Sequence, residues 1–249
     1  MQSGSSQFSY YFQQQQQSVP FGQKIDIALQ LTHLSPYTKS VLVKVYTTLS
    51  FCVASAFLGC LFSMFIYQPN ILLLIVADIA ALIYFATRPI QQTMNRFRAL
   101  MVVGFIVGIS LTPLVNYSID IDPSVVVSAI TTTAAVFLSF TFFSLMSDKR
   151  SFLYFGGTLT SLCVALIFMT LSQFFLHSQS LDKLIMCLYA VVLTGFLVFD
   201  TQFMIYRIEN GNDDYILHAF GLFMDLIDIF RFILRILAEN KKKEKKDRN

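Results

Sequence analysis

Long apolar runs separated by short polar stretches dominate the chain from residue 45 onward. Crossing about 30 Å of hydrocarbon takes roughly 18 to 20 helical residues. Six runs come near or exceed this length, at 45–67, 71–87, 99–117, 124–146, 152–176 and 183–206. The polar stretches between them leave no room for a soluble catalytic domain. The pattern therefore predicts an all-α, polytopic membrane bundle in which the helices themselves carry the function.

A seventh apolar stretch, 216–238, is marginal because it contains four charged side chains: Asp225, Asp228, Arg231 and Arg235. It either crosses the membrane at the centre of the bundle or dips in and returns. A re-entrant backbone is allowed only where protein encloses it. We expect a seven-helix bundle over residues 39–238, with a short central, re-entrant or crossing last helix.

Composition supports the bilayer as the solvent of this protein. The chain is 55% hydrophobic and 13% charged, whereas about 25% of the residues in a typical soluble domain are charged. The sequence has no GxSxG, HExxH, P-loop or GxGxxG motif, so we expect no enzyme and no cofactor. We expect the lipid bilayer as the main partner and no nucleic acid. The four cysteines lie inside apolar runs without CxxC spacing, which favours packing over metal binding.

Polar tails flank the predicted bundle. Residues 1–38 include a Gln/Ser-rich segment with five successive glutamines at 13–17, a composition typical of disorder. Residues 239–249 end in "KKKEKKDRN", a basic tail suited to anionic cytoplasmic lipid. We expect both tails in the cytosol.

Charge in the loops predicts the orientation of the helices, because cytoplasmic loops carry the excess of Lys and Arg. Basic residues follow the second and fourth runs, whereas acidic residues follow the third: Arg88, Arg96, Arg98, Lys149 and Arg150 against Asp120 and Asp122. Six crossings then return the chain to the cytosol near residue 207. A full seventh crossing would place the basic tail on the other side, so the charge rule and a seventh crossing disagree.

Acidic residues inside apolar segments are the candidate functional groups. An ionised Asp at the middle of a membrane helix costs roughly 2.5 to 3.5 kcal/mol on insertion scales, and such residues tend to mark ion or proton pathways. The chain has four: Asp78, Asp200, Asp225 and Asp228. Asp78 lies in the middle of "LLLIVADIAALIYF", and we expect it to face the bundle interior or water.

Asp200 and Asp225 lie on either side of the polar turn "RIENGNDDY". Counted from the turn at 1.5 Å per residue, Asp200 is roughly 12 Å and Asp225 roughly 15 Å deep. Antiparallel neighbours would bring the two carboxyl groups together, where they would share a proton and act as a pH switch. When both are ionised they offer a weak Ca²⁺ contact, because tight sites have six to eight oxygens.

Two structural explanations remain open for these acids. Asp200 would lie at a frayed end of its helix, and Asp225 or Asp228 would pair with Arg231 or Arg235. Asp228 and Arg231 are three residues apart, on one helical face, which favours a salt bridge for Asp228. These residues, with Asp78, are the further candidates for a pathway or a salt bridge. His218, seven residues before Asp225, is a weaker candidate for a proton relay.

Several segments in order resemble the Bax inhibitor-1 family, also called the transmembrane Bax inhibitor motif family. They are "GISLTPLV" (108–115), "SFLYFGG" (151–157), "GFLVFDTQ" (195–202), "DDYILHAFGLFMD" (213–225) and "KKKEKK". The resemblance implies a seven-helix protein of the endoplasmic reticulum membrane that suppresses stress-induced cell death and lowers stored Ca²⁺ through a pH-sensitive leak. It places the family's paired aspartates on Asp200 and Asp225.

The resemblance leaves two alternatives for the activity: regulation through other membrane proteins of the cell-death machinery, or Ca²⁺/H⁺ exchange. The sequence also departs from its relatives. Bacterial members carry an arginine of the second helix near the aspartates, whereas the run 71–87 contains none and Arg88 lies only at its end.

Overall fold

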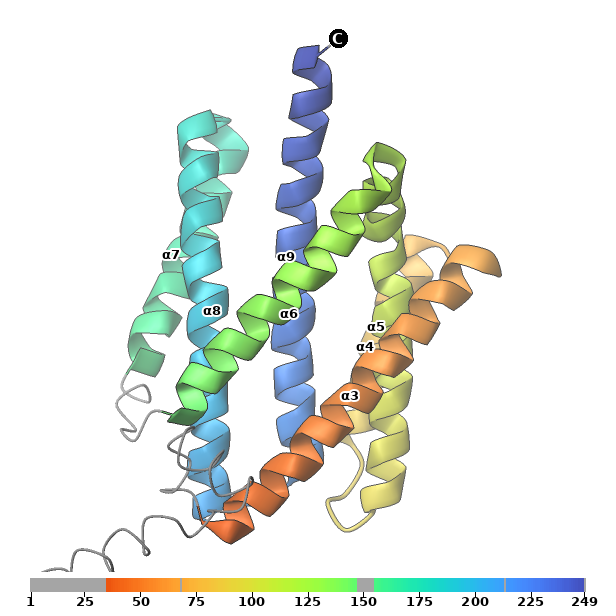
Figure 1. The fold of residues 1–249 in the computed structure, drawn as a ribbon, viewed down its shortest axis with the longest axis vertical. Helices are drawn as coiled ribbons and strands as arrows, with labels where there is room; N and C mark the ends of the chain where they lie inside the picture. Colours follow the sequence, from red (N-terminus) through yellow and green to blue (C-terminus); the bar gives the residue numbers. More distant parts are fainter. Residues whose placement is uncertain (1–34, 68, 147–154, 213, 249) are drawn as a thin grey trace, which may run out of the picture. The chain divides into compact units, whose positions relative to one another are not determined.

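The computed structural model describes residues 35–67, 69–146, 155–212 and 214–248, and Pro36–Asn249 form one compact unit. Within the described residues the chain forms seven helices and no strand (Figure 1). They are α3 (Pro36–Phe65), α4 (Ile71–Ala86), α5 (Thr93–Ile121), α6 (Pro123–Met146), α7 (Phe155–Leu176), α8 (Gln179–Glu209) and α9 (Tyr215–Arg248). The predictions for residues 1–34 and for Lys149 and Arg150 lie outside the described residues.

The predicted membrane bundle is confirmed. Among the described residues, five helices are long and apolar enough to cross a membrane: α3, α5, α6, α7 and α8. The 16 residues of α4 span about 24 Å, less than the hydrocarbon thickness. The first helix begins at Pro36 rather than at residue 45, so residues 36–38 belong to the bundle and not to the tail.

The last helix is not short. α9 runs without a break over 34 residues, about 51 Å at 1.5 Å per residue, and packs against α3, α5, α6 and α8 at the centre of the bundle (Figure 1). It has no re-entrant turn. Hydropathy underestimates this helix because Asp225 is partly buried and Asp228 pairs with Arg231. Its Lys and Glu residues are good helix formers that extend it past residue 238.

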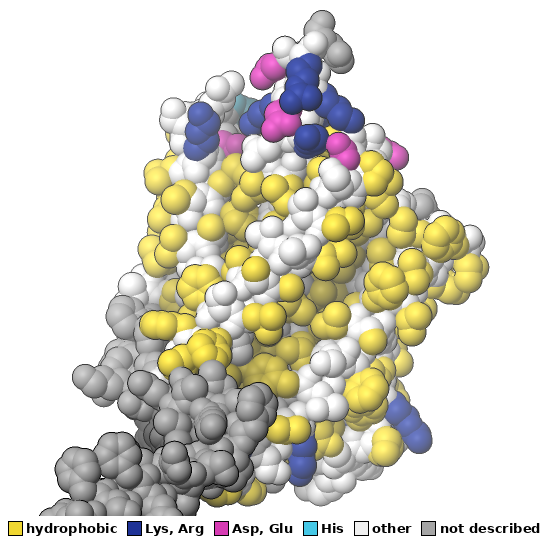
Figure 2. Space-filling model, in the orientation of Figure 1, with side chains coloured by type: hydrophobic (Ala, Val, Ile, Leu, Met, Phe, Trp, Pro, Cys, Tyr) yellow, Lys and Arg dark blue, Asp and Glu magenta, His cyan; other side chains and the backbone are white. Residues whose placement is uncertain are grey.

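The basic end of α9, residues 241–248, lies beside the end of α5. Lys242 Nζ is 3.3 Å from the Tyr117 hydroxyl, and Lys245 donates to the Ile121 carbonyl. The Pro36 end of α3 lies at the opposite end of the bundle (Figure 1). Acidic and basic side chains gather at the end that holds the C-terminus, a few separate basic side chains lie at the opposite end, and apolar side chains lie between them (Figure 2). The start of α3 and the basic end of α9 therefore lie at opposite ends of the bundle, whereas the tail of residues 1–34 lies outside the described residues.

Glycines bring α3 and α5 into close contact. A Cβ at Gly59 would collide with the Phe105 carbonyl, and one at Gly108 would collide with the Ala56 carbonyl. A hydrogen bond also joins the two helices: the Ser55 hydroxyl donates to the Met101 carbonyl at 2.7 Å. The two backbones therefore touch along a seam that only glycine permits.

In contrast, α7 lies at the edge of the bundle. It packs against α8 (Figure 1), and only 11% of the residues in its most apolar stretch are buried. Gly156 faces the Phe199 ring, and Gly195 faces the Leu159 side chain. The α7–α8 pair thus flanks the central helix without enclosing it.

Candidate functional site

Asp200 and Asp225 come together where α8 and α9 run side by side. The turn between these helices closes through Gly211, which has a φ of 84°, and returns α9 antiparallel to α8. Both side chains are partly buried, and their carboxyl groups lie within hydrogen-bonding reach of each other. Two carboxyl groups can share such a contact only when one carries a proton. Asp200 therefore does not lie at a frayed helix end.

The second oxygen of Asp225 has no partner among the residues that the structure describes. Asp225 Oδ2 is buried and makes no hydrogen bond to the described residues. A buried acceptor without a partner calls for a proton, a water or an ion. Together Asp200 and Asp225, here called the acid pair, offer one shared contact and one vacant oxygen in the interior of the bundle.

The residues that follow Asp200 fasten α8 to α6. Thr201 and Gln202 are both buried, and Gln202 Nε2 donates to the Ser144 carbonyl. The Ser144 hydroxyl donates to the Val198 carbonyl at 3.1 Å. Gln202 and Ser144 thus hold α8 against α6 at the depth of the acid pair, whereas the Thr201 hydroxyl donates to the Leu197 carbonyl of its own helix. Ser144 was not among the predicted residues, because a lone serine near the end of an apolar run gives no signal.

The other two acids have protein partners of their own. Asp78 on α4 accepts from the Ser110 hydroxyl of α5 at 2.7 Å, and its buried Oδ1 has no partner within the described part of the chain. Asp228 lies 3.5 Å from Arg231, the three-residue pair that the spacing predicted. Arg235 instead pairs with Glu239 at 3.7 Å.

A buried ion pair that the sequence did not predict lies at the start of α9. Arg96 Nη1 is 2.7 Å from Asp214 Oδ2, and both side chains are 7% exposed. Asp214 Oδ1 also accepts from the Leu217 backbone N–H at 3.2 Å, so Asp214 caps α9. The guanidinium of Arg96 lies 5.6 Å from the centre of the Phe85 ring. This cluster sets where α9 begins, and with it the depth of Asp225.

Two further candidates are placed by local contacts. Arg88, just past the end of α4, lies over the Tyr84 ring of that helix, 4.1 Å from the ring centre. His218 is buried, with Nε2 3.5 Å from the Asn212 carbonyl in the α8–α9 turn. Both side chains thus contact residues close to them in the sequence rather than the acid pair.

Metal ligation by a larger set of side chains is not indicated. Across the described ranges, no three or more His, Cys, Asp and Glu side chains form a group that could hold a metal ion. The four cysteines are free thiols. The acid pair thus supplies two carboxylates, fewer than the six to eight oxygens of a tight Ca²⁺ site.

Comparisons with known proteins agree on one family. A family model described as "Inhibitor of apoptosis-promoting Bax1" matches residues 38–242. The Bax inhibitor 1 homolog of Dictyostelium discoideum is 40% identical over 245 residues, which cover 96% of this chain and 95% of that protein. Bax inhibitor 1 of Homo sapiens is 33% identical over 233 residues, covering 92% of this chain and 98% of the human protein. Bax inhibitor 1 of Drosophila melanogaster is 28% identical over 215 residues, covering 86% and 88%.

Proposed function

Because the chain belongs to the Bax inhibitor-1 family, we propose that it is a multi-pass membrane suppressor of apoptosis that acts as a pH-sensitive Ca²⁺ leak. We place it in the endoplasmic reticulum membrane, as the family resemblance implies. Protons and Ca²⁺ are the sensed and transported ions, and no enzymatic step is involved. Tagged protein imaged beside a reticulum marker tests the location.

The observation that carries the proposal is the acid pair with its unpartnered oxygen. Asp200 and Asp225 lie within hydrogen-bonding reach, and Asp225 Oδ2 is buried without a partner. When the pair shares a proton, its two carboxyl groups hold α8 and α9 together. When that proton leaves, two negative charges face each other in a partly dehydrated site and repel. The same charges attract a divalent cation.

Weak binding suits this role. A permeating ion must bind favourably enough to enter and loosely enough to leave. Two carboxylates meet that demand, whereas a complete ligand shell would trap Ca²⁺. The acid pair is thus both the proposed sensor and the proposed ion contact.

Flux from reconstituted liposomes tests the proposal. Ca²⁺-loaded vesicles with the purified protein are followed across pH for the native chain, Asp200→Asn and Asp225→Asn. Both variants should flatten the pH profile and lower the Ca²⁺ flux by about tenfold or more. A loss of about 1.4 kcal/mol in the stabilisation of the passing ion slows its passage about tenfold. Asp182→Asn is the matched control, since Asp182 lies exposed in the first turn of the same helix. Unchanged rate and pH profile in both acid-pair variants would refute the leak.

A proton gradient separates a leak from an exchanger. If Ca²⁺ uptake requires an imposed pH difference and stops when an ionophore removes it, the protein is a Ca²⁺/H⁺ exchanger. A passive leak follows the Ca²⁺ gradient alone.

A second candidate is an interaction protein, favoured by the exposed basic end of α9, which carries five lysines and an arginine (Figure 2). Such a surface suits acidic partners or anionic lipid. Deletion of residues 239–249 discriminates: loss of cell survival with intact liposome flux would assign the protective effect to partner binding.

A further inference from the structure

Two threonines on the inner face of α6 depart from the usual behaviour of hydroxyls in this bundle. Other threonines donate to the backbone carbonyl four residues earlier: Thr131, Thr160, Thr170, Thr194 and Thr201. Thr133 and Thr141 are only 4% and 5% exposed, and neither Oγ1 has a hydrogen-bond partner among the described residues. The two hydroxyls therefore face the interior with their hydrogen-bonding capacity unused.

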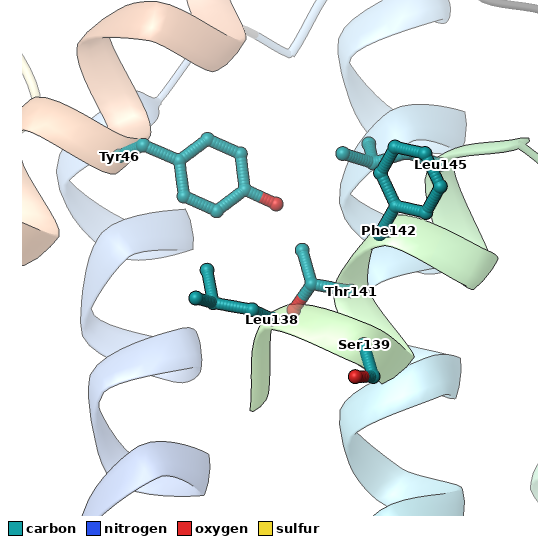
Figure 3. Close-up of a pocket in the computed structure, with 6 residues that line it drawn as sticks. All are labelled: Tyr46, Leu138, Ser139, Thr141, Phe142 and Leu145. Atoms are coloured by element: carbon teal, nitrogen blue, oxygen red, sulfur yellow. The ribbon is translucent and has the colours of Figure 1, made fainter. Parts of the chain in front are cut away.

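An open, mostly apolar pocket of about 470 Å³ between α3 and α6 is lined by Thr141. Tyr46 extends from α3 across it toward α6 (Figure 3). The Tyr46 hydroxyl is also buried without a partner. The remaining lining residues are Leu138, Ser139, Phe142 and Leu145, of which the first three are exposed at the outer rim of the pocket. Two unpartnered hydroxyls from different helices thus belong to one pocket.

The pocket lies at the depth of the acid pair. Ser144, three residues after Thr141, bonds to α8 on both sides of Asp200, through the Val198 carbonyl and the Gln202 amide. Three residues of helix rise about 4.5 Å, so Thr141 and Asp200 are separated by about one helical turn in depth. α6 also packs against α9, which carries Asp225.

Water best satisfies these groups. A buried hydroxyl without a partner is costly, more so inside a membrane. A lipid chain offers it no hydrogen bond. One water occupies about 30 Å³ of liquid and makes about three hydrogen bonds to buried polar groups. The inner end of the pocket, which has a volume of about 470 Å³, has room for several waters beside the hydroxyls of Tyr46 and Thr141, although its outer rim is mostly apolar.

We propose that Tyr46, Thr133 and Thr141 form the wall of a hydrated path along α6 that delivers protons and hydrated Ca²⁺ to the acid pair. Phe137 is 5% exposed and lies between the two threonines on the same face. Its position on α6 is midway between the two threonines, which are about 12 Å apart along the helix axis. Phe137 is the gate of this path, since apolar constrictions in channels close by excluding water. The assignment rests on the proposed leak.

Cysteine labelling tests the path independently of transport. Thr133→Cys and Thr141→Cys are placed in a chain whose native cysteines are replaced and whose flux is retained, and are exposed to a charged methanethiosulfonate reagent. Because only the thiolate reacts, and it forms in water, both should react about tenfold or more faster than Thr131→Cys. Thr131 is a matched control: it lies on the exposed, outer face of α6. Equal, slow labelling at all three positions would overturn the path, as would protection of Thr141→Cys by bound lipid.

Flux in the native-cysteine chain gives a second measurement. Thr141→Val and Tyr46→Phe remove a hydroxyl with little change in shape and should lower Ca²⁺ flux several-fold, whereas Thr131→Val should not. Phe137→Ala should raise flux. If labelling is fast but Ca²⁺ flux is unchanged in Asp200→Asn and Asp225→Asn, the path is supported and the proposed sensor is refuted. Acid-pair-dependent flux with slow labelling would support the sensor and overturn the path.

Discussion

Arg96 and Asp214 form a buried ion pair, 2.7 Å between Nη1 and Oδ2, across 118 residues of sequence. One carboxylate oxygen holds the guanidinium and the other caps α9. The pair thereby joins the start of α5 to the start of α9. Because Asp225 is eleven residues further along α9, about 16 Å at 1.5 Å per residue, this junction fixes the height at which the acid pair meets.

Arg96→Gln should destabilise the bundle strongly. It leaves Asp214 as an uncompensated buried charge, which typically costs about 3 to 5 kcal/mol. Thermal unfolding in detergent measures the loss. Arg98→Gln, an exposed arginine on the same helix, should have little effect. Equal behaviour of the two variants would show that the pair does not hold α9.

Gly59→Ala and Gly108→Ala should each cost about 1 to 3 kcal/mol of stability, the usual range for overpacking. Each added methyl group would meet a backbone carbonyl of the facing helix. Gly157 and Gly221 are matched controls, because a Cβ at either position meets nothing within 4 Å. Alanine at the controls should stabilise by about 0.5 to 1 kcal/mol, since Ala is the better helix former. Thermal unfolding of the four single variants decides between these outcomes.

Single cysteines at Lys39 and Lys243 should be labelled from opposite sides of the membrane. Lys39 lies in the first turns of α3 and Lys243 in the basic end of α9, at the two ends of the bundle (Figure 1). A membrane-impermeant thiol reagent, applied to sealed vesicles and then to opened ones, measures the sidedness. Labelling of both from one side would mean that α9 does not cross.

The stability contributed by Asp122 should disappear in acid. The Ser124 side chain and its backbone N–H, together with the charges of Lys241 and Lys245, lower the pKa of the Asp122 carboxyl. A group whose folded pKa is depressed stabilises above its unfolded pKa, near 3.9, and loses that effect as pH falls further. Asp122→Asn should therefore unfold more easily than the native chain at pH 7, and the difference should narrow as the pH falls below about 4 and vanish only below the lowered pKa of Asp122. Unfolding followed across pH, with Asp120→Asn as the charge-matched control, gives the comparison.

Local patterns predicted most of this architecture. The lengths of the apolar runs predicted the helices. Counting residues outward from the turn between α8 and α9 predicted that Asp200 and Asp225 lie at a similar depth. The same reasoning missed contacts between distant segments. Arg96 seemed to be a loop charge and Asp214 a turn residue, because nothing local in the sequence links them. Ser110, the partner of Asp78, and the unpartnered hydroxyl of Thr141 likewise emerge only from packing.

The seam between α3 and α5 gives the bundle a mechanical asymmetry. Backbones in contact at Gly59 and Gly108 can neither slide nor rotate without driving a carbonyl into the facing helix, so these two helices move as one stiff body. Between α7 and α8, in contrast, Gly156 and Gly195 face side chains rather than backbone. Any motion that admits an ion should therefore be a displacement of α8 relative to the fixed pair of α3 and α5. Distances between spin labels on α6 and α8 should change, whereas distances between labels on α3 and α5 should not.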